Sequence, residues 1–326
     1  MVKMIDVARH AGTSVATVSR VLNNNDRVAP ELVRRVMASA TELGYTPNPL
    51  ARNLRLQRTN LWLLIISDIE NPFFTSVARG VEDVAQRNGF SVVLCNAAED
   101  EKKEARYVSL AATESAAGVI LSPHSANVRI EKLTEKSIPL VVIDRPLNVP
   151  VDFVTADSRG GARIATEHLL AQGWRRPACI VGPKSAETAA LRRLGYEDAL
   201  RAAGVKTSRV VHQPYNIEGG RAAAAQLLDR RPPPDAFFAA NAALALGVLE
   251  ELRSRGLRQG SDVGLISFDD APWARVTDPP LSVVSQPAYH IGTCAADMLV
   301  RRIKGTLHGP VQRVVLDTEL VVRGST

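Results

Sequence analysis

A repeated alternation of short apolar segments with longer amphipathic segments runs from residue 61 to residue 268 and constrains the fold most strongly. The apolar segments, such as LWLLIIS at 61–67 and VGLISF at 263–268, contain almost no polar residues. Continuous apolar runs of this length are typical of strands that are buried on both faces of a helix-covered parallel sheet. Because two such series follow one another, we expect an α/β body of two lobes with parallel sheets.

Residues that directly follow the predicted strands are candidates for ligand binding, because open α/β sheets bind ligands beyond the carboxyl ends of their strands. They combine aromatic faces with amide and charged groups, which suits a sugar ring and its hydroxyls. Asn and Pro before a helix are also ordinary helix caps, so each residue taken singly has a structural interpretation. The candidates are residues 71–74 (Asn-Pro-Phe-Phe), Asp144, Arg145, Asn241, Asp269 and Asp270.

Residues 1–58 differ from the body in charge. They contain nine Lys and Arg against four Asp and Glu, whereas the rest of the chain has 31 against 30. Basic segments attract polyanions, and Lys and Arg contacts to phosphates supply most non-specific affinity for nucleic acid. A merely solvated basic surface is the other interpretation.

The sequence of this basic segment predicts three short helices. Gly12 separates residues 5–11 from a second helix over 15–22, for which Ser14 is a good N-cap. A third helix follows over 30–43, with Pro30 at its first position. Two helices joined by a tight glycine turn and closed by a third form a helix-turn-helix domain, expected over residues 1–46.

A hinge is expected over residues 47–58. Asn48 and Pro49 can start a helix over 50–55, which is shorter than the ~12–15 residues that an isolated helix needs for marginal stability. Such a helix would form only when a surface or a partner chain supports it. A plain linker is the alternative.

The segments IDVARHAGTSVATVSRVLN and ELGYTPNPLARNLR closely resemble the DNA-binding head and hinge helix of the LacI/GalR family of bacterial transcription regulators. The resemblance implies that Val15, Ala16 and Arg20 face base edges in the major groove and that Leu54 wedges into the minor groove. Ala29, where the family usually has a capping Ser or Thr, departs from the pattern. The DNA-binding residues implied are Ser14, Val15, Ala16, Thr17, Ser19, Arg20, Asn23, Ala51, Leu54 and Arg55.

The body, residues 59–326, is similar to the periplasmic-binding-protein-like effector domain of the same family, through the NPFF, IDRP, RRLGY, ISFDD and PPLSVVSQP segments. The resemblance implies an N-lobe of about 59–157 and 288–311 and a C-lobe of about 158–287 and 312–326. Trp273 is a further candidate for the cleft, with a core aromatic as the alternative. The effector-binding residues expected are Asn71, Phe73, Phe74, Asp144, Arg145, Arg192, Tyr215, Asn241, Asp269, Trp273 and Gln286.

One departure concerns Ala242, where the family usually has an Asp that grips sugar hydroxyls. Loss of that carboxylate is expected to leave the cleft more positive, near Arg145 and Arg192. This favours an anionic effector, such as a sugar acid or a sugar phosphate. A neutral sugar in a slightly different pose is the equal alternative.

Other classes of protein fit the sequence less well. A solute-binding receptor of a transport system would share the body fold, but it needs export, and no signal peptide pattern opens the chain. No catalytic motif or metal-ligand spacing is present, so neither an enzyme nor a cofactor is expected. The expected protein is a cytoplasmic homodimer that binds palindromic operator DNA and a small sugar-like effector, with no membrane association.

Overall fold

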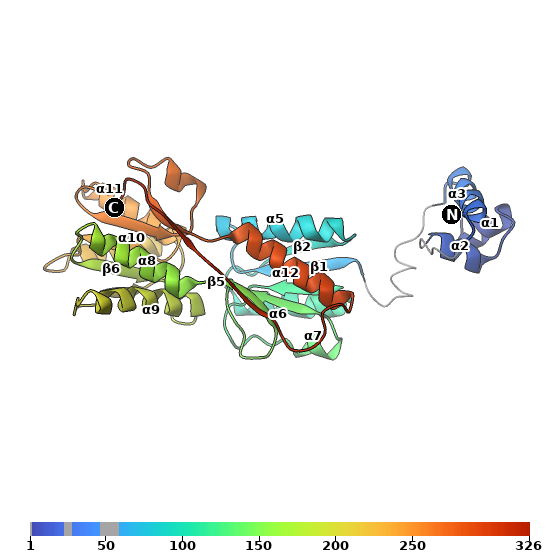
Figure 1. Cartoon of the computed structure of the whole chain (residues 1–326), viewed down its shortest axis with the longest axis horizontal. Coiled ribbons are helices and arrows are strands. Elements are labelled where there is room, and N and C mark those ends of the chain that lie inside the picture. The colour runs from blue at the N-terminus through green and yellow to red at the C-terminus, as the bar shows by residue number, and fades with distance from the viewer. Residues whose placement is uncertain (1, 23–27, 46–58) are drawn as a thin grey trace. The chain divides into compact units, whose positions relative to one another are not determined.

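The computed structural model describes residues 2–22, 28–45 and 59–326 (Figure 1). The chain divides into two compact units, Met1–Thr59 and Asn60–Thr326. The predicted hinge helix and the candidates Asn23, Ala51, Leu54 and Arg55 lie outside the described residues.

The first unit is built from the three helices that the sequence predicts. Val18 and Val21 of the second helix are buried against Val7 of the first and Val36 of the third. The Ser14 hydroxyl accepts the backbone N–H of Thr17 at 3.1 Å, which begins the second helix as expected. The helices are α1 (Met4–His10), α2 (Val15–Leu22) and α3 (Pro30–Glu42).

The first lobe of the body contains a six-stranded, wholly parallel sheet in the order β11-β5-β4-β3-β1-β2. Its central strand β1 is buried on both faces: Trp62 and Leu64 join one hydrophobic core, whereas Leu63 and Ile65 join another. The strands are β1 (Leu61–Ile66), β2 (Ser91–Asn96), β3 (Gly118–Leu121), β4 (Leu140–Ile143), β5 (Asp152–Ala156) and β11 (Arg313–Leu316). The helices are α5 (Pro72–Arg87), α6 (Glu101–Thr113), α7 (Glu131–Glu135) and α12 (Ala288–Ile303).

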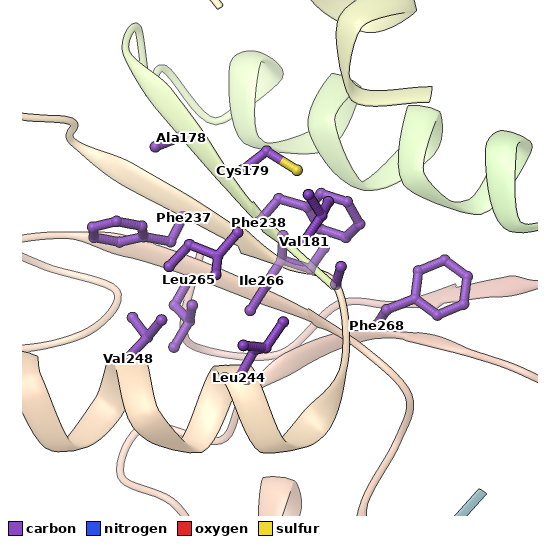
Figure 2. Packing of buried hydrophobic residues seen from close by; sticks show 14 of the residues in the cluster. Ala178, Cys179, Val181, Phe237, Phe238, Leu244, Val248, Leu265, Ile266 and Phe268 are labelled. Carbon is purple, nitrogen blue, oxygen red and sulfur yellow. The ribbon is translucent and has the colours of Figure 1, made fainter. Parts of the chain in front are cut away.

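The second lobe repeats this plan with the order β12-β10-β9-β8-β6-β7, in which only the pairing of β12 with β10 is antiparallel. Its core packs Phe237 and Leu265 of the sheet near Leu244 and Val248 of α11 (Figure 2). The strands are β6 (Pro177–Val181), β7 (Val210–His212), β8 (Ala236–Ala239), β9 (Gly264–Phe268), β10 (Ser282–Ser285) and β12 (Glu319–Val321). The helices are α8 (Ser158–Ala171), α9 (Glu187–Ala202), α10 (Ile217–Leu228), α11 (Ala242–Ser254) and the 3-10 helix η1 (Pro272–Arg275).

The chain crosses between the lobes three times, after β5, after β10 and between β11 and β12. The last crossing lies later than the expected boundary at 312, because residues 313–316 pair with β5 in the first sheet. Asp152 of β5 anchors this returning strand, since it accepts the Gln312 backbone N–H at 2.8 Å and pairs with Arg302 of α12 at 2.6 Å.

Glycines bring paired helices into close contact in both lobes. A Cβ atom at Gly80 of α5 would collide with the backbone of α12 at Tyr289, and one at Gly220 of α10 would collide with the Leu244 carbonyl of α11. Figure 1 shows α5 and α12 side by side. The close packing of α10 on α11 matters for function, because the caps of both helices, Asn216 and Asn241, line the same cavity.

Candidate functional site

A cavity of about 350 Å³ lies between the two lobes of the body. Every predicted effector-binding residue except Trp273 lines it. The full lining is Asp68, Asn71, Phe73, Phe74, Ala98, Glu99, Asp144, Arg145, Thr188, Arg192, Pro214, Tyr215, Asn216, Asn241, Asp269 and Gln286. The structure therefore brings together side chains that are more than 200 positions apart in the sequence, such as Asn71 and Gln286.

Trp273 lies in the 3-10 helix Pro272–Arg275 and packs against the hydrophobic core of the second lobe. It is absent from the lining of the cavity, so its position fits the alternative interpretation of a core aromatic. Trp273 is only four residues after Asp269 in the sequence, but the 3-10 turn directs its ring to the core and not to the cavity.

Several lining residues are absent from the set that was predicted from the sequence, and two of them also follow parallel strands. Asp68 comes shortly after β1 and Glu99 shortly after β2. The same rule that selected Asp144 and Asp269 would have found both. Thr188, in the first turn of α9, gave no comparable signal because the strand before it ends at Val181.

Three asparagines place helix N-termini at the cavity. The Oδ1 atoms of Asn71, Asn216 and Asn241 accept backbone N–H groups of the helices that they cap, at 3.0, 2.7 and 2.8 Å. Each cap uses the oxygen of the amide and leaves its NH₂ group available as a donor. The partial positive charge of the three helix ends also favours electron-rich oxygen atoms in the cavity.

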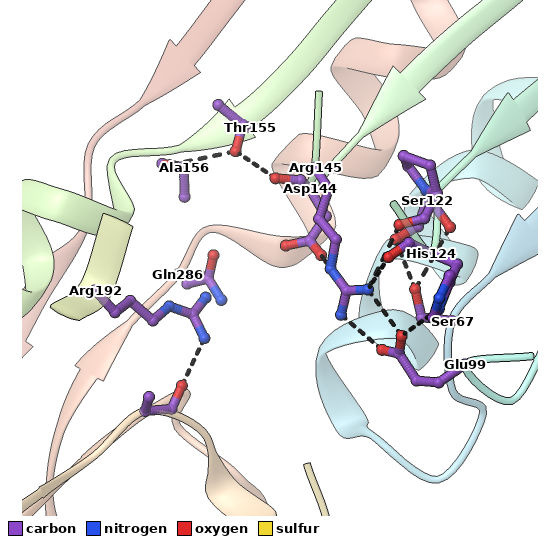
Figure 3. A network of polar contacts seen from close by, with 12 residues as sticks. Ser67, Glu99, Ser122, His124, Asp144, Arg145, Thr155, Ala156, Arg192 and Gln286 are labelled. Carbon is purple, nitrogen blue, oxygen red and sulfur yellow. Dashed lines mark hydrogen bonds and ion pairs between the residues drawn. The ribbon is translucent and has the colours of Figure 1, made fainter. Parts of the chain in front are cut away.

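Arg145 is the most strongly paired group of the site (Figure 3). Its guanidinium is buried and donates to both carboxylate oxygens of Glu99, at 2.6 and 2.8 Å, and its Nε lies 3.4 Å from Asp144. Burial lowers the pKa of Arg145, but the hydrogen bonds and charges of these two carboxylates outweigh it and raise the pKa. The positive charge of Arg145 is thus compensated within its own lobe.

Arg192 approaches from the second lobe and is paired differently. Its Nη1 donates to the Ala240 carbonyl at 2.6 Å, and its guanidinium stacks 3.8 Å from the centre of the Phe268 ring. Its buried Nε has no hydrogen-bond partner among the described residues. A buried polar atom without a partner is costly, so this atom indicates a place where a ligand can bind.

Asp144 and Asp269 occupy equivalent positions in the two lobes, directly after β4 and β9. Both have left-handed backbones, with φ of 65° and 77°, and both side chains are almost buried. Such strain in a residue other than glycine is concentrated at functional sites. Burial raises the pKa of both carboxyls, opposed by the charge of Arg192 and, for Asp144, also of Arg145.

The lining of the cavity does not support the expected anionic effector. The lining contains the carboxyl groups of Asp68, Glu99, Asp144 and Asp269 against only two guanidinium groups. Ala242 does not line this cavity. The side chain of Asn241 does so, whereas Ala242 lines a neighbouring cavity, so a missing carboxylate there leaves the surroundings of the two arginines unchanged.

The predicted DNA-contacting residues of the first unit lie on and before α2. Val15, Ala16 and Arg20 are exposed, and Thr17 and Ser19 are half-buried, while Val18 and Val21 of the same helix face the core. The Ser14 hydroxyl is exposed and also bonds to the Thr17 hydroxyl at 2.9 Å. Helix α2 therefore exposes two small apolar side chains and a single guanidinium to the solvent.

In residues 2–22, 28–45 and 59–326, no group of three His, Cys, Asp or Glu side chains is arranged to hold a metal ion. Within the same described ranges, no helix is long and apolar enough to cross a membrane.

Comparisons with known proteins agree with this architecture. The profile of "Bacterial regulatory proteins, lacI family" matches residues 3–48, and that of a periplasmic binding protein-like domain matches residues 166–326. The chain is 36% identical to the HTH-type transcriptional regulator DegA of Bacillus subtilis, covering 98% of this chain and 97% of that protein. It is 33% identical to the HTH-type transcriptional repressor CytR of Escherichia coli, covering 99% and 96%.

Solved structures resemble the whole chain as well. A complex of the transcriptional regulator CelR with cellobiose has a TM-score of 0.77 and 35% identity, covering 100% of both chains. The lac repressor dimer bound to operator and the anti-inducer ONPF has a TM-score of 0.86 and 25% identity, covering 99% of this chain and 98% of that chain. The chain thus belongs to the lacI family of bacterial regulatory proteins, and it is a transcriptional regulator and not an enzyme.

Proposed function

We propose that this regulator is a cytoplasmic, homodimeric repressor that releases a palindromic operator when a neutral, sugar-like effector binds between its lobes. The observation that carries the proposal is the interlobe cavity, in which one buried aspartate and one buried arginine from each lobe surround a single ligand-sized space. The relatives support it, since one is described as a repressor and another is solved with cellobiose.

Binding to DNA is assigned to residues 1–58. Arg20 is exposed on α2 and can bond to guanine O6 and N7, while Val15 and Ala16 can pack on thymine methyl groups. The proposed contact set is completed by Ser14, Thr17 and Ser19, together with Asn23, Ala51, Leu54 and Arg55, which the family resemblance implies. Two-fold symmetry of the dimer requires two half-sites, as in the lac repressor dimer that was solved on its operator.

The second copy is placed against the edge of the first lobe's sheet in this proposal. Strand β2 is the edge strand of its sheet, and it exposes Val93 and Leu94, at 39% and 40% of their surface. An exposed apolar edge strand is prone to pair with another chain, so burial of this edge in a dimer would protect it.

A neutral effector is favoured because the cavity already has more carboxyl groups than guanidinium groups in its lining. An anion would have to compete with Glu99 for Arg145 and would lie beside the buried carboxyls Asp144 and Asp269. Sugar hydroxyls, in contrast, can donate to these carboxyls and accept from the Asn caps. Phe73 and Phe74, packed edge to face with 5.0 Å between ring centres, offer an apolar surface to the ring.

The effector can change operator affinity only if it prefers one arrangement of the lobes. It would contact both lobes, as well as Gln286, which lies in the crossing between β10 and α12. A hundredfold preference corresponds to about 2.7 kcal/mol of coupling. We propose induction as the direction, so an effector that tightens operator binding would mean corepression.

The proposal can be tested by a thermal-shift screen followed by operator binding. Purified full-length protein is melted with glucose, ribose, gluconate and glucose 6-phosphate, and each sugar that raises the Tm is then added to a complex with a selected operator. A ligand at 100 times its Kd stabilises the folded protein by about 2.7 kcal/mol, which a melt resolves. A neutral hit that releases the operator supports the proposal, and a response to the acids alone refutes the neutral effector.

A matched pair of variants links the response to the cavity. Asp269→Ala removes a buried carboxyl of the lining and should abolish the Tm shift. Asp262→Ala removes a carboxyl whose side-chain partner in the described part of the chain is exposed Arg258, and it should leave the shift intact. If both variants respond like the wild type, the effector does not bind in this cavity.

A further inference from the structure

A second cavity of about 200 Å³ adjoins the interlobe cavity. The two share Asn71, Phe73, Asp269 and Gln286, which therefore stand between them. The second cavity is bounded on one side by the first turn of α5 and on the other by the segment that follows β9. It adds more than half of the volume of the first cavity.

The lining of this second cavity suits an uncharged, hydroxyl-bearing group. Thr75, Ser76 and Ser285 supply hydroxyls, and apolar surface comes from prolines and alanines, while no Lys, Arg or His side chain is among its described lining residues. Its carboxyls are those of Asp269 and Asp270, and none of its described lining residues offers a cation to hold an anionic group.

The hydrogen bonds of Asp270 also favour a hydroxyl-bearing group in the second cavity. Its Oδ2 is held by Arg275 at 2.9 Å and by Arg323 at 2.8 Å. Its Oδ1 is buried and has no hydrogen-bond partner in the described part of the chain. A buried carboxylate oxygen without a donor is unfavourable, and a hydroxyl placed beside it would satisfy it.

Ala242 keeps this space open. It is the first residue of α11, its side chain is buried, and it lines the second cavity but not the first. Asn241, the residue before it, lines the first cavity, so two consecutive positions at one helix end serve the two cavities separately. A longer side chain at position 242 would fill the second cavity without entering the first.

We propose that the two cavities are two subsites for one ligand and that the effector is a neutral disaccharide. This inference rests on the proposed sugar-binding function and specifies the size of the sugar. One ring occupies the interlobe cavity among Asp144, Arg145 and Arg192. The second ring lies in the adjoining cavity beside Asp270, and the glycosidic bond passes Asn71 and Asp269, which contact both rings.

The test is isothermal titration calorimetry of the full-length protein with matched sugars. The probes are glucose and galactose as monosaccharides, and cellobiose, maltose, lactose and melibiose as disaccharides. We expect at least one disaccharide to bind at least tenfold more tightly than its constituent monosaccharides. Ala242→Leu should remove that gain and leave the monosaccharide affinity unchanged. Ala243→Leu makes the same chemical change at a neighbouring half-buried position that lines neither cavity, and should leave both affinities unchanged.

A second variant, Ser76→Ala, tests the same cavity without changing α11, in which Ala242 lies. Ser76→Ala removes one hydroxyl of the second cavity and should weaken disaccharide binding by about threefold to tenfold, with no effect on the monosaccharide. Equal affinities for mono- and disaccharides, or a disaccharide gain that survives both Ala242→Leu and Ser76→Ala, would overturn the second subsite while leaving the sugar-binding function intact. If none of the sugars binds, the sugar-binding function fails and the second subsite fails with it.

Discussion

A single buried carboxyl group predicts how the stability of the body changes with pH. Glu104 of α6 is only 1% exposed, and it accepts the His124 backbone N–H at 2.7 Å. Burial raises its pKa from 4.5 to about 7, although the His124 hydrogen bond and the charge of Arg145 act in the opposite direction. Glu99 lies near enough for its negative charge to add to the increase.

The sign of the effect follows from the raised pKa. The folded protein holds the proton of Glu104 up to about pH 7, whereas the unfolded chain loses it near pH 4.5. The stabilisation is therefore fully present below pH 4.5 and is lost as the pH rises through 7. At about 1.36 kcal/mol per pKa unit, the free energy of unfolding falls by up to about 3 kcal/mol across this window.

Replacement of Glu104 by Gln tests this reasoning, because Gln stays neutral and its carbonyl can still accept the His124 N–H. Thermal melts of the wild type and Glu104→Gln at pH 5, 6, 7 and 8 should nearly coincide at pH 5 and separate as the pH rises. At pH 8 the variant should be more stable by several degrees, since about 2–4 °C corresponds to 1 kcal/mol in a protein of this size.

The control is Glu114→Gln at the C-cap of the same helix, where the side chain is exposed. It should change the Tm little, and by a similar amount at each pH. A difference between the wild type and Glu104→Gln that is the same at all four pH values would refute the argument. Other titrating groups do not affect this comparison, because they are common to both proteins.

Three further substitutions test other parts of the structure. Arg20→Ala should cost about 1–3 kcal/mol in operator binding and relax the preference at one base position, as measured by fluorescence anisotropy on operator variants. Arg302→Ala leaves the buried Asp152 carboxylate without its ion pair and should lower the free energy of unfolding by about 3–5 kcal/mol in urea titrations. Gly220→Ala forces a methyl group against the Leu244 carbonyl and should cost about 1–3 kcal/mol by the same assay, and a wild-type stability would mean that α10 and α11 can separate freely.

The elements with strong periodicity were predictable from the sequence, and the weakly patterned edge elements were not. Strand β1 is apolar throughout because both of its faces are buried, and this pattern identifies it without any tertiary information. Strand β11 is only half-buried and pairs with β5 from far away in the sequence. Local pattern contains no information on such a pairing, so the second lobe was expected to begin again at residue 312.

The cavity residues were predictable where they follow a strand. Asp144 and Asp269 were found because the ends of parallel strands converge at one edge of a sheet. Trp273 was included on proximity in sequence alone, and a 3-10 turn directs it to the core. The effect of Ala242 on the charge and shape of the binding site could not be derived from sequence. It depends on which of the two cavities the first residue of α11 lines.

The three crossings between the lobes also set the order in which the protein can be completed during synthesis. The first lobe begins at β1, yet it needs α12 and β11, which the ribosome makes only after most of the second lobe. The sheet of the second lobe, in turn, receives its edge strand β12 after β11 has been made. The first lobe cannot fold early as an independent unit. Its strands lack α12 and the partner strand β11 while some 130 residues of the second lobe are translated. Both lobes are therefore finished nearly together, and a truncation before β11 would leave two incomplete sheets instead of one complete lobe.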